Sequence, residues 1–76
     1  MTRLHPVRAR QVMRFLISLG FVQVRQRGSH KFFRHPDGRT ATVPDHQGED
    51  LGRGILAKIL RDADSTTEQL YNWLGH

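Results

Sequence analysis

The sequence has 76 residues, of which 37% are hydrophobic and 25% charged, and it contains no cysteine. This length fits one domain, and the lack of cysteine excludes a disulfide-stapled secreted domain and a zinc finger. Ten arginines and two lysines outnumber seven acidic residues, and the resulting net charge of +5 favours nucleic acid as a partner. No apolar run is long enough for a membrane span or a signal peptide, so we expect a cytoplasmic protein without membrane contact.

The chain begins with a short lead-in over residues 1–6, followed by a predicted amphipathic helix over residues 7–19. Gly20 fits the position that follows the last turn of this helix. The apolar side chains recur every three or four residues and therefore form one helical face. They are Val12, Phe15, Leu16 and Leu19.

Three strands are predicted after this helix, over residues 21–27, 29–35 and 39–43. In the first strand valines alternate with glutamine and arginine, as in a half-buried strand. Gly28-Ser29 forms the first turn and Pro36-Asp37-Gly38 the second. Because such short turns join antiparallel neighbours, the three strands should form a meander.

A polar loop then leads to a second helix over residues 53–64, and Ser65 to Glu68 reads as the capping box of a short C-terminal helix. The expected fold is therefore α+β, with the order α-β-β-β-α plus the short C-terminal helix, in one domain over residues 1–76. The helices should cover one face of a three-stranded antiparallel sheet and leave the other open. We expect these side chains to be buried: Leu16, Val22, Val24, Phe33, Ala41, Val43 and Leu60.

The adjacent residues Phe32 and Phe33 must point to opposite faces of the sheet. If Phe33 lies in the core, His30 and Phe32 share the open face; if Phe32 lies there instead, His30 is buried. An imidazole, an aromatic ring and several guanidinium groups on one surface suit single-stranded RNA, since bases stack on the ring and phosphates bind the arginines. The arginines expected on this face are Arg25, Arg27 and Arg34.

RNA can be cleaved without a metal because its 2′-OH is an internal nucleophile, which needs a base, an acid and nearby cations. His30 is the candidate for one of the two proton transfers, although a structural histidine is the alternative. The second group stays open, because His35 has the opposite parity on the same strand and His46 lies in a loop.

Two other kinds of site fit the sequence less well. His30, His35 and His46 have no spacing typical of a metal centre, so we expect no metal and no cofactor. Residues 53–74 resemble a helix-turn-helix only in outline, because the second helix carries apolar side chains and no cation. We therefore expect no direct binding of DNA.

Several segments of the chain resemble the HicA toxin family, and Gly28-Ser29-His30 at the start of a strand is the most specific of them. The resemblance spans about residues 8–64 and leaves 65–76 as a C-terminal helical extension. The other segments are Gly20-Phe21-Val22, Arg25-Gln26-Arg27, residues 34–39, Thr42-Val43-Pro44, His46, Asp50-Leu51 and 54–63.

This resemblance implies a fold like that of double-stranded-RNA-binding domains and the activity of an mRNA interferase in a toxin–antitoxin pair. It places the catalytic histidine of the family at His30 and implies a HicB-type antitoxin that covers the active site. A non-catalytic RNA-binding module on the same fold is the alternative. The residues expected to contact RNA are Arg25, Arg27, Gly28, Ser29, Lys31, Phe32, Arg34 and Arg39.

Overall fold

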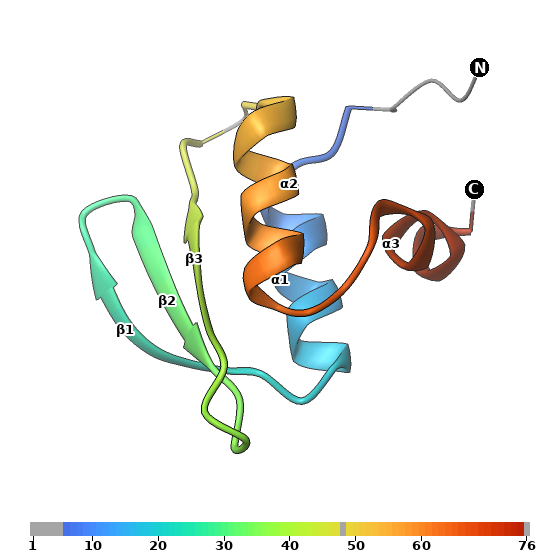
Figure 1. Ribbon diagram of the computed structural model, residues 1–76. Helices are drawn as coiled ribbons and strands as arrows, with labels where there is room; N and C mark the ends of the chain where they lie inside the picture. The colour runs from blue at the N-terminus through green and yellow to red at the C-terminus, as the bar shows by residue number, and fades with distance from the viewer. Residues whose placement is uncertain (1–5, 48, 76) are drawn as a thin grey trace.

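The computed structural model describes residues 6–47 and 49–75, so residues 1–5 of the predicted lead-in lie outside the described part. Three helices and three strands follow one another in the predicted order (Figure 1). None of the helices in the described ranges is long and apolar enough to cross a membrane. The elements are α1 (Ala9–Ser18), β1 (Val22–Arg27), β2 (His30–Arg34), β3 (Thr40–Pro44), α2 (Arg53–Asp62) and α3 (Thr67–Leu74).

The three strands form an antiparallel sheet in the order β1-β2-β3. Both α1 and α2 pack on the same face of this sheet and contact it at β3. The third helix lies on the far side of α1 and α2 from the sheet (Figure 1), where Trp73 contacts Phe15 with 5.7 Å between ring centroids. The predicted α+β fold, with helices on one face, is therefore confirmed.

The core lies between the helices and the two strands β2 and β3. Five of the seven side chains expected in the core are buried, but Val22 and Val24 are each 59% exposed, so the prediction for these two valines was wrong. The helices reach the sheet at β3, and all six residues of β1 at the opposite edge are exposed. The five that are buried as expected are Leu16, Phe33, Ala41, Val43 and Leu60.

A β-bulge in β1 is the second reason for the error. Gln23 pairs with Phe33 and Arg25 pairs with Phe32, so Val24 is an extra residue between two successive partners. The simple alternation that grouped the two valines on a core face therefore fails at this position.

The start of α3 differs from the prediction by one residue. Thr66, not Ser65, caps the helix, and its Oγ1 accepts a hydrogen bond from the Gln69 N–H at 3.1 Å. Ser65 still belongs to the end of α2, where its N–H donates to the Leu60 carbonyl at 2.8 Å after the left-handed Asp64. The capping box is present, but it is formed by Thr66 and Gln69.

Candidate functional site

The burial of Phe33 decides which side chains occupy the open face of the sheet. Phe33 is 1% exposed, so His30 and Phe32, at odd separation from it on β2, face away from the helices. In the ladder, His30 lies between Arg27 and Pro44, and Phe32 lies opposite Arg25. Paired residues share a face, so the histidine, the aromatic ring and the two arginines of β1 lie on one surface.

The bulge at Val24 is what brings the arginines of β1 to this surface. Without the extra residue, Arg25 would lie opposite Lys31 and would point to the helix side. With it, the Arg25 guanidinium lies 4.9 Å from the centroid of the Phe32 ring. The pair is a cation–π contact that offers a flat stacking surface to a base and a positive charge to a phosphate.

His30 begins β2 directly after the Gly28-Ser29 turn and is exposed. The turn is held in place because the Ser29 carbonyl accepts a hydrogen bond of 2.7 Å from the Asp45 N–H. Within residues 6–47 and 49–75, no side chain or carbonyl forms a hydrogen bond or an ion pair with the His30 imidazole. Both ring nitrogens can therefore reach a ligand on the open face.

Lys31 points the other way. It pairs with Val43 in the ladder, and its Nζ lies 2.7 Å from Oδ2 of Asp45 in a half-buried ion pair. Together with the start of α1 it lines a groove of about 630 Å³, which also includes His46. The predicted RNA contact at Lys31 stays a prediction, and it would come from the side opposite to His30.

Arg34 and Arg39 lie at the far end of the sheet from His30. Arg34 is exposed and shares the open face with Phe32, since it pairs with Thr40 and Val22. Arg39 is engaged within the protein: its Nε donates to Asp37 at 2.8 Å, and Nη1 donates to the Ala63 carbonyl. These contacts explain Arg39 as a link between the β2–β3 turn and the end of α2.

The hydrogen bonds around Asp37 also affect its titration. The backbone N–H of Arg39 donates to Oδ1 of Asp37 at 3.0 Å and lowers the pKa of this carboxyl below its ordinary value of 3.8. The Arg39 side chain acts in the same direction, while desolvation opposes both.

His35 follows the end of β2 and is fixed by its surroundings. Its Nε2 lies 3.0 Å from the Leu19 carbonyl oxygen. Its Nδ1 lies 3.1 Å from the Asp37 backbone nitrogen and 3.0 Å from Oδ1 of the Asp37 side chain. The ring edge contacts Phe21 at 5.1 Å between centroids. Five residues of extended chain, about 16 Å, separate His35 from His30, so both cannot act on one phosphate.

A protein-family model described as the HicA toxin of bacterial toxin–antitoxin matches residues 9–64. The chain belongs to the HicA toxin family. A search among curated proteins gives no match.

Membership of the HicA family makes this chain the toxin of a toxin–antitoxin pair. The matched residues run from the start of α1 to the end of α2, so they include His30 and the whole sheet, while α3 follows them in the chain. Within residues 6–47 and 49–75, no three side chains of the metal-binding types are grouped in a way that could hold an ion.

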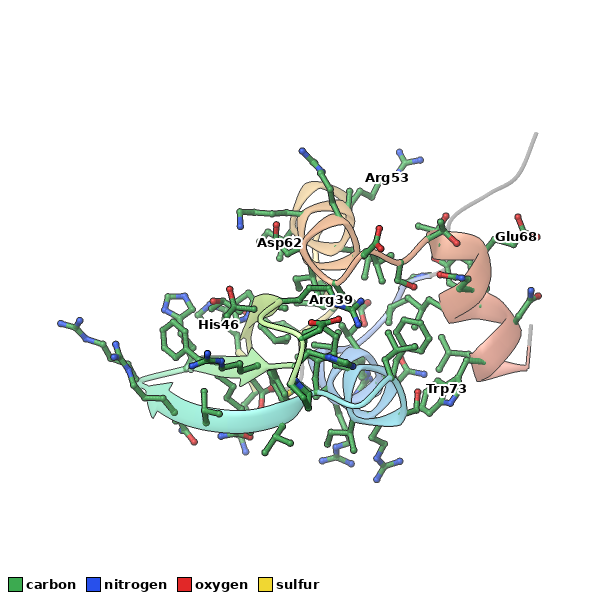
Figure 2. The ribbon with its side chains drawn as sticks, turned by 60° about the horizontal axis from the view of Figure 1, so that its bottom comes forward. Arg39, His46, Arg53, Asp62, Glu68 and Trp73 are labelled. Carbon is green, nitrogen blue, oxygen red and sulfur yellow. The ribbon has the colours of Figure 1, made fainter. Side chains whose placement is uncertain are left out.

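Sequence reasoning left one residue near the candidate site without a position. His46 lies in the loop two residues after Pro44, the ladder partner of His30. Figure 2 shows it beside the sheet on the side away from α3, whereas Arg39 lies between the sheet and the helices. The signal that could have found it is the pairing of β2 with β3, which fixes the end of the ladder at which this loop starts.

Proposed function

We propose that the protein is an endoribonuclease toxin that cleaves mRNA without a metal, with His30 as a catalytic residue. The observation that carries this proposal is the exposed His30 imidazole beside Arg27 on a sheet face without covering helices, next to the Arg25–Phe32 stack. Cleavage of mRNA by this protein would inhibit translation and growth in the cytoplasm.

In the proposed reaction a base stacks on Phe32 and the phosphate lies near Arg27. His30 takes the proton of the 2′-OH, and the 2′-oxygen attacks phosphorus while the bond from phosphorus to the 5′-oxygen breaks. The arginines stabilise the additional negative charge of the transition state. The products are a 2′,3′-cyclic phosphate and a 5′-OH, whose oxygen needs a proton from a second donor.

The antitoxin of the pair is proposed to be a HicB-type protein that covers the open face of the sheet. This face presents arginines and the half-buried Phe32 ring, so a partner with acidic side chains would pair with the cations and exclude RNA at the same time. Binding of RNA and of the antitoxin would then be mutually exclusive.

A non-catalytic RNA-binding module is the second candidate function. The contact of Arg25 with Phe32 supports it, because a stacking surface binds bases whether or not an imidazole stands beside it. The two functions differ in what happens to the RNA after binding.

The deciding experiment compares wild type with His30→Ala. On induction, wild type should stop growth and fragment mRNA, and the variant should do neither. The purified wild type should cleave an oligoribonucleotide in the presence of EDTA and leave 2′,3′-cyclic phosphate ends, while the variant binds the RNA with similar affinity. A folded variant with full activity would contradict the proposal, and intact RNA bound to an inactive wild type would favour the binding module.

A further inference from the structure

We propose that Thr42 is a specificity-determining residue, whose hydroxyl forms a hydrogen bond with the edge of the base at the cleaved bond. This inference rests on the proposed endoribonuclease function and names the group that distinguishes one RNA sequence from another. It comes from the register of β2 and β3, the contact of Arg25 with Phe32, and the free hydroxyl of Thr42.

The ladder places Thr42 beside the Phe32 ring on the open face of the sheet. Phe32 pairs with Arg25 on β1 and with Thr42 on β3, so the three residues form one row across the sheet. Direct partners share a face and have Cβ atoms about 4.5–5.5 Å apart. The Thr42 side chain therefore lies next to Phe32, on the side opposite to Arg25.

The two neighbours of Phe32 leave different amounts of room beside its ring. The Arg25 guanidinium lies over the ring at 4.9 Å from the centroid, so it occupies one of the two ring faces. Side chains on a strand stand roughly perpendicular to the sheet, so the other ring face is turned toward β3. Thr42 is short, and a base stacked on this second face would have its edge above the Thr42 hydroxyl.

The Thr42 hydroxyl is available to such a base. Thr42 is half-buried, and within residues 6–47 and 49–75 its Oγ1 forms no hydrogen bond. No buried side-chain nitrogen or oxygen in these ranges lacks a partner, so this unpaired oxygen is open to solvent. A threonine hydroxyl can donate and accept, as the edge of an RNA base requires. A base without a matching atom would leave the hydroxyl unpaired and would bind less well.

The spacing along β2 assigns this base to the nucleotide that carries the attacking 2′-OH. His30 lies two residues from Phe32 on the same face, which is about 6.6–6.8 Å along the strand. A ribose whose 2′-OH is at His30 therefore has its own base within reach of Phe32 and Thr42. Thr40 also lies on this face, but it pairs with Arg34, about 13 Å along the strand from the His30 pair.

The test uses oligodeoxynucleotides that contain a single ribonucleotide, whose base is A, C, G or U. Only this nucleotide has a 2′-OH, so it determines which bond can be cleaved. The four substrates compete in one reaction, and the ratios of their products give relative kcat/KM. Thr42→Val keeps the branched shape but lacks the hydroxyl, so it should reduce the ratio between the best and the poorest base by about 2–10-fold, as for one hydrogen bond.

Two further variants separate the hydroxyl from the rest of the side chain. Thr42→Ser retains a hydroxyl and should keep the wild-type preference. Thr40→Val is the matched control, because it makes the same change on the same strand and face, and it should also keep the preference.

Rates that fall equally for all four bases in Thr42→Val would show a structural role and overturn the proposal, as would a wild type without a base preference. Neither result affects the proposed function, which requires only that wild type cleaves RNA and His30→Ala does not. A wild type that cleaves neither these substrates nor an oligoribonucleotide would contradict the proposed function. The relative affinities for the same four oligonucleotides would then decide the role of Thr42 by the same comparison.

Discussion

The two ends of β2 carry the same kind of side chain in opposite situations. At one end, His30 is exposed, and within the described residues its ring has no hydrogen-bonding partner. At the other, the His35 side chain is 20% exposed and both of its nitrogens are engaged. The difference arises from the neighbouring segments, since the connection from α1 to β1 packs on His35 while no helix covers His30.

This comparison teaches that the position of a histidine along a strand does not determine its role. His35 joins three segments, because it contacts the Leu19 carbonyl, the Phe21 ring and the Asp37 N–H. His30 joins none and is available to a ligand. We expect His35 to contribute to the stability of the fold and His30 to contribute to activity.

The largest expected effects come from replacing each of the two histidines by alanine and comparing the activity and stability of the two variants. His30→Ala should lower cleavage by about 10²–10⁴-fold and change the free energy of unfolding by less than about 0.5 kcal/mol, as for other exposed sites. His35→Ala should destabilise the fold by about 1–3 kcal/mol, because it leaves hydrogen-bonding groups without a partner. Urea unfolding and single-turnover cleavage measure both; equal losses of stability would contradict the comparison.

Alanine substitutions at Gly20 and Gly38 separate the cost of crowding the His35 ring from the cost of the left-handed backbone. Both have a left-handed backbone, with φ of +103° and +100°, but a Cβ at Gly20 would lie 2.9 Å from Nε2 of His35, while one at Gly38 meets nothing within 4 Å. Each alanine should cost about 1–2 kcal/mol for the backbone alone, and Gly20→Ala should cost more than Gly38→Ala. Urea unfolding measures the difference.

A double variant tests whether the contact with the His35 ring causes the extra cost at Gly20. In the double variant Gly20→Ala/His35→Ala the extra cost at Gly20 should disappear, because the ring that crowds the new Cβ is gone. Additive costs would mean that the contact with His35 is not the cause.

The comparison of the two ends of β2 also applies to two arginines, Arg25 on the open face and Arg39 beside His35. Arg25→Ala should reduce the log–log salt slope of RNA binding by about 0.7, the value for one phosphate contact on a single strand. Arg39→Ala should leave the slope unchanged and lower the urea midpoint, since its guanidinium binds Asp37 and Ala63. Arg53 at the start of α2 points away from the sheet (Figure 2), so Arg53→Ala is the matched control for charge.

The smallest expected effect is on acid stability at the His35 end. The lowered pKa of Asp37 means that its carboxylate favours the folded state above about pH 3.8, and that this contribution is lost as the pH falls through the lowered value. Asp37→Asn should therefore flatten the dependence of the unfolding free energy on pH below pH 4. Acid titrations of wild type and variant that run parallel would contradict this origin.

Much of this arrangement could be predicted from the sequence, because hydrophobic spacing and short turns determine the elements and Phe33 determines the face. The arginines of β1 were placed correctly on the open face, but for a reason that fails. The prediction relied on buried Val22 and Val24, whereas both are exposed and the bulge sets the face of Arg25. A bulge depends on how two strands pair, and this information is not present in one strand alone.

The position of His46 could not be predicted from the sequence, for a similar reason. A loop residue has no periodicity that could place it, and only the pairing of β3 with β2 shows at which end of the sheet it lies. The predicted start of α3 was wrong by one residue because the Ser65 N–H bonds to the Leu60 carbonyl at the end of α2, and Thr66 caps α3 instead. The capping-box motif alone does not show that the preceding helix uses Ser65.

The edge strand β1 also bears on how this protein behaves at high concentration. An edge strand has one row of backbone groups outside the ladder, and Val22 and Val24 add exposed apolar surface beside them. Such edges tend to join across molecules unless charge or an irregularity keeps them apart. The bulge between Gln23 and Arg25 increases the local twist, and Arg25 and Arg27 would face the same charges on a second copy. We therefore expect the features that suit this strand to the proposed RNA contact also to oppose edge-to-edge association.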